Sequence, residues 1–342
     1  MWLRKILILA CVAGIAGIAS IAAPQDKSPV ELVQSIALPD LHDGDFDHLI
    51  VDARGNRLFA CAEENSKVLV FDLAANKLIH TMDDLKAPHS LLYRADLKEL
   101  FVVDGDLGEV KIYDTTSYQL KQSIKLREGA DSSVYDPATK YLYVVDGGKE
   151  AKLPNVFLSI VDTTTAKKIG EIKIDSISAE AMAVEKSGPR LFVNVRGNNT
   201  VEVYDRKTRA LLATWPVSQE SKNPTAMAFD EAHHRLFIGT REPAKLLVLN
   251  SDTGKILASL PAVAAVDDLA FSAKQNRIYY SGSEFLDVFE QNDPDHYEQV
   301  GHIPTSFRAH TGVFSEELNR YYLGIPKHEG KGAEIRIYGA RQ

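Results

Sequence analysis

Acidic residues and histidines recur at one fixed position of a repeating pattern in this chain of 342 residues. The position lies eleven places before a pair that usually joins leucine to an aromatic residue. Six of its seven occupants are ionisable, and in chain order they are Asp47, His89, Asp131, Glu180, Thr225, Asp267 and His310. Imidazoles and carboxylates that meet at one place can transfer protons, or hold a divalent ion such as Zn²⁺, Mn²⁺ or Ca²⁺.

The pair that sets this spacing recurs along nearly the whole chain. Its seven members are Leu58-Phe59, Leu100-Phe101, Leu142-Tyr143, Leu191-Phe192, Leu236-Phe237, Ile278-Tyr279 and Tyr321-Tyr322. They are spaced by roughly 42–49 residues, close to the ~40–45-residue period of a β-propeller blade. The spacing therefore predicts seven repeated units of one architecture.

Each unit contains four short runs that are rich in Val, Ile, Leu and Tyr. In residues 86–128 the runs are 89–93, 99–103, 109–113 and 119–126, and Asp, Gly, Ser and Thr separate them. This pattern predicts four antiparallel strands per unit. The last unit lacks a fourth run, and residues 31–38 have the matching pattern. We therefore predict that residues 31–38 pair with 334–338 and close the ring.

The predicted fold class is all-β, a seven-bladed β-propeller that forms one domain over residues 24–342. The chain resembles seven-bladed propellers with YVTN-type repeats, including the bacterial YncE-like secreted proteins. Matching segments are Leu142-Tyr143-Val144-Val145-Asp146-Gly147 and Leu191-Phe192-Val193-Asn194, although neither is a strict Tyr-Val-Thr-Asn. The resemblance covers about residues 30–342. It implies the fold and an exported location, but no shared chemistry.

The resemblance also implies that the first strand of each blade lines a central tunnel. The seven recurring residues then form a ring near the tunnel mouth, on the face where the loops between blades gather. Blades 7, 1, 2 and 3 are consecutive after closure, so their ring residues are candidate metal ligands, namely Asp47, His89, Asp131 and His310. The other interpretation is a water-filled mouth whose polar rim only satisfies backbone groups.

Further ligand-binding candidates come from neighbours of the ring and from loops after the second strands. The full set of ligand-binding candidates is Asp47, His48, His89, Asp104, Asp131, Asp146, Glu180, Arg196, Arg241, Asp267 and His310. Acidic loop residues fall on blades 2 and 3 and basic ones on blades 4, 5 and 7. Such opposed charge could orient a polar ligand.

Residues 1–23 combine two early positive charges with an apolar run, which is typical of a cleaved export signal. The predicted location is periplasmic or extracellular, and the alternative is a chain tethered to a membrane by an uncleaved N-terminal segment. The formal net charge of −8 gives nucleic-acid binding little support, and we expect no nucleic-acid partner. We expect a monomer, with no membrane contact beyond the export signal.

Two classes of function stay open at this point. The first is an exported propeller that binds a small polar ligand, a metal ion or a protein partner at the mouth, without chemistry of its own. The second is a metal-dependent hydrolase, lactonase or lyase, in which His89, His310 and Glu180 are the candidate catalytic residues. Turnover that is lost on chelation would separate the second class from the first.

Overall fold

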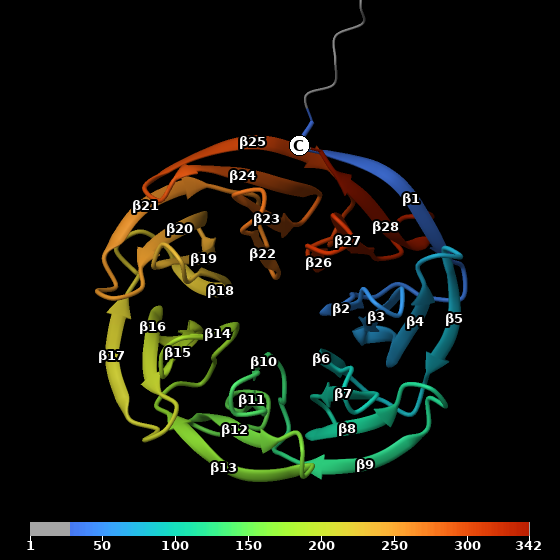
Figure 1. The fold of residues 1–342 in the computed structure, drawn as a ribbon, viewed down its shortest axis with the longest axis horizontal. Helices are drawn as coiled ribbons and strands as arrows, with labels where there is room; N and C mark the ends of the chain where they lie inside the picture. The colour runs from blue at the N-terminus through green and yellow to red at the C-terminus, as the bar shows by residue number, and fades with distance from the viewer. Residues whose placement is uncertain (1–27, 342) are drawn as a thin grey trace, which may run out of the picture.

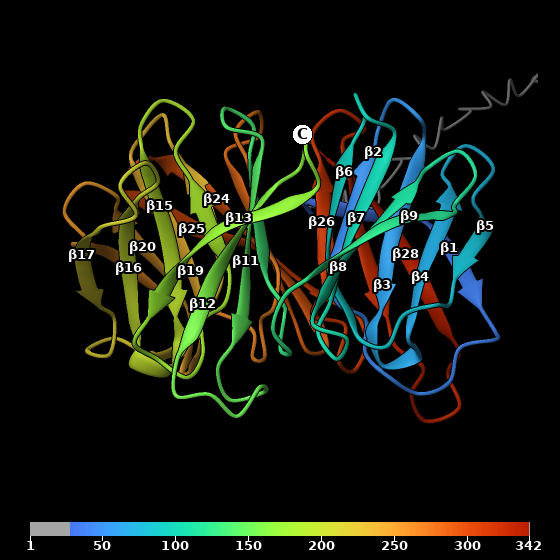
Figure 2. The same cartoon turned by 90° about the horizontal axis from the view of Figure 1, so that it is seen from below.

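Seven four-stranded antiparallel sheets surround a central axis in the computed structural model, which describes residues 28–341 (Figure 1). The strands run between two loop-covered faces (Figure 2). The predicted seven-bladed all-β propeller is therefore confirmed. The predicted export signal, residues 1–23, lies outside the described residues. Within the described residues, no helix is long and apolar enough to cross a membrane.

Blades 1 to 4 follow one another along the chain, each from its inner to its outer strand. Blade 1 contains β2 (Leu49–Asp52), β3 (Arg57–Ala62), β4 (Lys67–Asp72) and β5 (Lys77–Met82). Blade 2 contains β6 (Pro88–Arg94), β7 (Glu99–Asp104), β8 (Glu109–Asp114) and β9 (Leu120–Lys125). Blade 3 contains β10 (Ser133–Asp136), β11 (Tyr141–Gly147), β12 (Val156–Asp162) and β13 (Lys167–Ile174). Blade 4 contains β14 (Met182–Val184), β15 (Arg190–Val195), β16 (Thr200–Asp205) and β17 (Leu211–Pro216).

Blades 5 to 7 complete the ring. Blade 5 contains β18 (Lys222–Asp230), β19 (Arg235–Glu242), β20 (Ala244–Asn250) and β21 (Ile256–Pro261). Blade 6 contains β22 (Leu269–Ser272), β23 (Arg277–Gly282), β24 (Phe285–Asp293) and β25 (His296–Pro304). Blade 7 contains β26 (Gly312–Ser315), β27 (Arg320–Ile325) and β28 (Ala333–Ala340), together with β1 (Val30–Leu38). Two short 3-10 helices, η1 (Glu63–Asn65) and η2 (Arg196–Asn198), follow β3 and β15.

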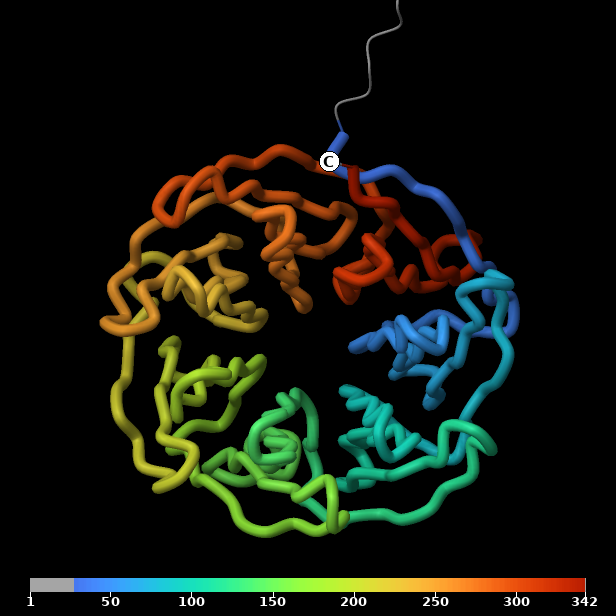
Figure 3. The backbone as a smooth tube through the Cα atoms, viewed as in Figure 1, coloured from blue at the N-terminus to red at the C-terminus, as the bar shows by residue number. Residues whose placement is uncertain are grey.

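The N-terminal strand closes the ring, as predicted. β1 pairs antiparallel with β28 from Val30↔Ala340 to Leu38↔Ala333, with a register shift between Leu32 and Gln34. The blue and red ends of the chain accordingly lie side by side (Figure 3). The last blade thus takes strands from both ends of the chain, and this pairing protects the edge of β28.

Buried apolar clusters lie between neighbouring blades and explain the recurring pair. Leu58 packs in the cluster between blades 7 and 1, whereas Phe59 packs in the one between blades 1 and 2. Leu100 and Phe101 repeat this arrangement one interface further on. Successive side chains of a strand point to opposite faces, so each pair joins its blade to both neighbours. The repeat in the sequence is therefore the repeat of these interfaces.

Candidate functional site: the tunnel mouth

A cavity of about 260 Å³ opens at one end of the tunnel, and all seven ring residues line it. We call it the mouth cavity. Loops between consecutive blades and loops after second strands supply its wall. Besides the ring, its polar wall includes Asp45, His48, Glu63, Lys149, Glu150, Arg196 and Arg241.

Local bulges aim the ring side chains. The backbone N–H of Asp47 donates to Cys61 O at 2.9 Å, while Cys61 N–H donates to His48 O at 3.2 Å, so two residues face one. The same two-against-one arrangement places Asp131 and Ser132 opposite Val145, and Glu180 and Ala181 opposite Asn194. A bulge of this kind bends the strand and redirects a side chain. In blades 1, 3 and 4 the chain therefore turns one residue toward the cavity just before the first strand.

The backbone at these positions also connects the blades. His48 N–H donates to His89 O at 3.1 Å, and Ala181 N–H donates to Thr225 O at 3.2 Å. Asp268 N–H makes the equivalent bond to His310 O at 3.2 Å. The carbonyl group of a ring residue thus holds the neighbouring blade, independently of its side chain.

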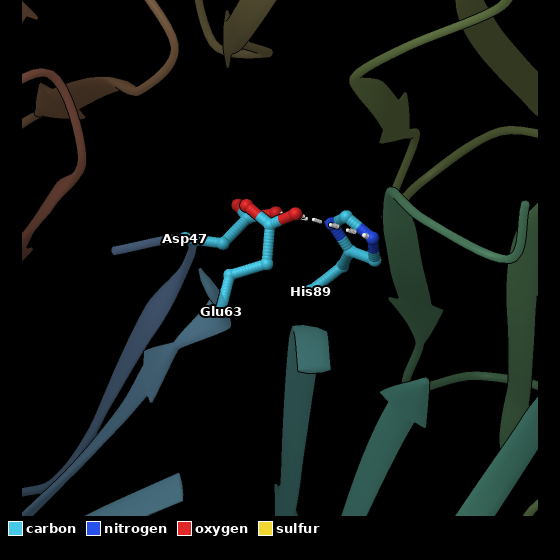
Figure 4. A group of neighbouring side chains, drawn as sticks. All are labelled: Asp47, Glu63 and His89. Carbon is cyan, nitrogen blue, oxygen red and sulfur yellow. Dashed lines mark hydrogen bonds and ion pairs between the residues drawn. The ribbon is translucent and has the colours of Figure 1, made fainter. Parts of the chain in front are cut away.

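Three side chains meet where blades 1 and 2 face the cavity (Figure 4). His89 Nδ1 lies 2.6 Å from Asp47 Oδ2, and His89 Nε2 lies 3.8 Å from Glu63 Oε1. Asp131 Oδ1 is 3.7 Å from His89 Nδ1. The imidazole is packed closely, because a Cβ atom built on Gly105 would lie 2.7 Å from His89 Nε2. A side chain at position 105 would therefore force the imidazole to move.

The rest of the wall is arranged in ion pairs. Arg196 bonds to Glu180 and Arg241 to Asp267, each at 2.9 Å. His48 Nδ1 lies 2.8 Å from Asp268 Oδ1. His310 Nε2 lies 3.7 Å from Asp45 Oδ2, and Arg308 also contacts Asp45. Asp45 Oδ1 and His310 Nδ1 are buried and have no hydrogen-bond partner among the described residues.

Burial and mutual repulsion shift the pKa values of the mouth carboxyls. Burial raises the pKa of Glu63 to about 7, although His89 opposes the shift. Burial and the charge of Asp131 raise the pKa of Glu180 to about 7. Burial and the charge of Asp47 raise the pKa of Asp267 to about 6. The mouth therefore holds carboxyl groups that exchange protons near neutral pH.

In His89 and its hydrogen-bonded partner Asp47, by contrast, the charged forms are favoured. Burial disfavours the charged form of His89, but Asp131, Asp47 and Glu63 outweigh it and raise the pKa of His89 to about 10. Burial of Asp47 is likewise outweighed by His48 and His89, so its pKa is lowered. At neutral pH, Asp47 and His89 form an ion pair in which both partners are charged.

The structure brings nine of the eleven ligand-binding candidates to the mouth cavity. Asp104 and Asp146 differ from the expectation, since both are fully buried and neither lines the cavity. Asp104 accepts backbone hydrogen bonds from Lys86, Ala87 and Leu107, at 2.8, 3.2 and 3.1 Å. Asp146 bonds to Arg127 and Ser159. These carboxylates hold loops together rather than offering oxygens to a ligand.

The predicted metal set is also arranged differently from the expectation. Asp47, His89 and Asp131 lie together, whereas His310 faces Asp45 on the wall of blade 7. The compact donor group that the described residues form contains Glu63 in place of Asp131 and His310. Position around the ring sets which blades are neighbours, but it does not set the direction of each side chain.

Glu63 was missed, although the same spacing locates it. It stands five places after Leu58, as Arg196 does after Leu191 and Arg241 after Leu236. All three residues line the cavity. Asp104 and Asp146 stand only four places after the leucine of their pairs. Side chains alternate along a strand, so these two point away from the cavity. The number of residues after each leucine therefore separates the cavity-lining residues from the buried carboxylates.

We expect Glu180→Gln to change how stability depends on pH. The folded pKa of about 7 exceeds the ordinary value of 4.5, so the folded chain holds a proton that the unfolded chain releases. The wild type should therefore lose stability relative to the variant as pH rises from about 4.5 to about 7. At pH 8 the variant should be more stable by about 1–3 kcal/mol, and at pH 4 the two should be nearly equal.

Urea unfolding at pH 4, 6 and 8 measures this difference. Glu298→Gln is the control. Glu298 is exposed on β25, so this substitution removes the same charge far from the mouth. Equal pH profiles for wild type and Glu180→Gln would show that the cavity does not favour the protonated carboxyl.

Comparisons with known proteins support the fold. No family model matches the chain. THO complex subunit 3 of Arabidopsis thaliana is 22% identical over 249 residues, which is 71% of this chain and 73% of that protein. A chain in the crystal structure of the mitotic checkpoint complex has a TM-score of 0.73 at 15% identity, covering 99% of both chains. The RRP9 WD40 repeats have a TM-score of 0.75 at 11% identity, covering 90% of this chain and 99% of theirs.

These similarities are to propellers of the WD40-like kind. None of them confirms the resemblance to YVTN-type secreted proteins. At these identities the solved structures establish the architecture alone.

Proposed function

We propose that this propeller is an interaction module whose mouth cavity receives a lysine or arginine side chain of a protein partner. The observation that carries the proposal is the charge of the cavity wall. Seven carboxylates line it, from Asp45, Asp47, Glu63, Asp131, Glu150, Glu180 and Asp267. Three permanent cations, from Lys149, Arg196 and Arg241, offset part of this charge. Neighbouring carboxylates raise the pKa values of His48 and His89, so these imidazoles are also positive at neutral pH, and the carboxylates remain in excess. A partially enclosed negative cavity attracts a cation more strongly than an open surface does.

Apolar residues around the mouth support a protein as the partner. Ile177 lines the cavity and is 52% exposed. Leu153 and Phe307 are also exposed, in loops that open on the same face. Exposed apolar residues around a polar centre are typical of protein-interaction surfaces. Two of the similar propellers are named as parts of complexes, the THO complex and the mitotic checkpoint complex, which agrees with this role.

Short peptides test the proposal directly. We expect a blocked pentapeptide with a central lysine between glycine and serine residues to bind at least 10-fold more tightly than the same peptide with glutamate. Isothermal titration at low and moderate salt measures both, and the lysine peptide should weaken as salt rises. Asp131→Asn and Asp267→Asn should each weaken the lysine peptide about 10-fold, because one favourable charge contact of about 1.4 kcal/mol is lost.

Glu298→Gln is the control for this experiment and should bind like the wild type. Equal affinity for the lysine and glutamate peptides would contradict the proposal. Binding of simple alkylamines as tight as that of the peptide would point instead to a small polar ligand.

A second candidate, the metal-dependent hydrolase, lactonase or lyase, is favoured by one observation. His89 is bonded to Asp47, and Glu63 beside it has a pKa of about 7, which suits proton transfer at neutral pH. Hydrolysis of a panel of lactones and esters, with and without a chelator, tests this candidate. Absence of turnover under both conditions would exclude these substrates.

Export is retained as part of the proposal, on the composition of residues 1–23. Intact-mass measurement of the native protein tests it. A mass that includes residues 1–23 would contradict cleavage, and would favour the alternative of a membrane-tethered chain.

A further inference from the structure

Three carboxylates share one imidazole where blades 1 and 2 meet the mouth cavity. They are Asp47, Asp131 and Glu63, at 2.6, 3.7 and 3.8 Å from a ring nitrogen of His89. Asp47 has a second cationic neighbour in His48. Within the described part of the chain, His89 is the one ion-pair partner of Asp131 and of Glu63. The group therefore carries more negative charge than its own side chains balance, and a further cation would stabilise it.

The donors are also close enough to share one ion. One atom each from Asp47, Glu63 and His89 lies within 4.8 Å of the others. Metal–ligand bonds of about 2.0–2.2 Å place the donors of one ion about 3–4 Å apart, so small side-chain rotations close the site. Figure 4 shows the three side chains converging from two blades.

Two of the donors are held in place before any ion binds. The Asp47 side chain is 10% exposed, and its Oδ1 accepts the His48 N–H at 2.8 Å. His89 is enclosed by Gly105 and lies at a register shift of β6 between Pro88 and Leu91. On the blade 7 side of the same cavity, the buried Asp45 Oδ1 and His310 Nδ1 have no partner among the described residues, and a polar group bound in the cavity would satisfy them.

We propose that Asp47, Glu63 and His89 bind one divalent transition-metal ion, Zn²⁺ or Mn²⁺, in the wall of the mouth cavity. The ion replaces the proton that His89 otherwise carries in its ion pair with Asp47, so binding releases this proton to solvent. An imidazole nitrogen among the donors favours these ions over Ca²⁺ and Mg²⁺, which prefer oxygen ligands alone. Three protein donors leave at least one position open toward the cavity, as in metal sites that bind a ligand. The site shares the acidity on which the proposed function rests, but its ligands come from blades 1 and 2 alone.

Titration of the full-length protein with the metal alone tests the site. After dialysis against a chelator, we expect one Zn²⁺ or Mn²⁺ ion per chain by isothermal titration, retained through gel filtration and counted by elemental analysis. Glu63→Gln should weaken binding at least 100-fold. The side chain of Glu63 makes no hydrogen bond among the described residues, so this variant should fold normally, which circular dichroism and thermal unfolding check.

Glu150→Gln is the matched control. Glu150 is the same residue type in the wall of the same cavity, but it lies outside the donor group. This variant should bind the ion within about threefold of the wild type. The site is overturned if both variants lose affinity equally, if Glu63→Gln loses none, or if Ca²⁺ binds and neither Zn²⁺ nor Mn²⁺ does.

The peptide experiment separates failure of this site from failure of the proposed function. If protein dialysed against a chelator binds the lysine peptide but no metal, the proposed metal site is wrong and the proposed function stands. If the protein binds neither the peptide nor the metal, both proposals are wrong.

Discussion

Ile36→Asp is expected to lower the free energy of unfolding by about 3–5 kcal/mol or more, because it places a charge in the interface that closes the propeller. Ile36 lies on β1 opposite Ile335 of β28 and packs in the cluster between blades 7 and 1. The strand comes from the opposite end of the chain, so its loss exposes both the cluster and the edge of β28. Chemical denaturation followed by circular dichroism measures the change.

Ser35→Asp provides the comparison, because Ser35 is the exposed neighbour on the same strand. Its effect should stay below about 0.5 kcal/mol, as for most surface substitutions. Soluble aggregates are expected for Ile36→Asp alone, since an unpaired strand edge recruits other chains. A similar stability for the two variants would mean that β1 does not hold the ring closed.

Asp104→Ala is expected to cost about 3–4 kcal/mol of stability while leaving metal and lysine-peptide affinities within about threefold of the wild type. Three backbone N–H groups, of Lys86, Ala87 and Leu107, donate to this fully buried carboxylate. Each buried donor that loses its partner costs about 1–3 kcal/mol, and partial rearrangement of the loop offsets some of the sum. Thermal and urea unfolding, together with the two titrations, measure both halves of the expectation.

Asp106→Ala serves as its control. Asp106 is exposed two residues further along the same loop, so its removal should change stability little. An Asp104→Ala variant that folds as stably as the wild type but loses ligand affinity would restore Asp104 to the binding site.

The fold could be predicted from the sequence because its repeat follows directly from packing. Each leucine-aromatic pair places one side chain in the interface before its blade and one in the interface after it, so spacing along the chain is spacing around the ring. The closing strand was recognisable for a related reason. The pattern of residues 31–38 matches other outer strands, and the last unit had no outer strand of its own.

The site could be predicted only in part. Spacing gives the position of a residue along the propeller axis, but it does not give the residues that its side chain contacts. The ring residues do line one cavity, and Arg196 and Arg241 join them. Asp104 lies one residue before the position that lines the cavity, so strand alternation directs its side chain into the buried loop instead. The contact of His310 with Asp45 depends on rotamers and on a loop outside the repeat, so no sequence count could supply it.

The bulges at the mouth have a consequence for how such a protein can change. At His89, Thr225 and His310 the main-chain carbonyl accepts a hydrogen bond from the preceding blade, whereas all seven ring residues line the cavity. The identity of the side chain is therefore largely uncoupled from assembly, as Thr225 shows by occupying its place in the ring without a charge. Seven adjustable sites on a constant frame allow a new specificity to evolve, or to be designed, one blade at a time.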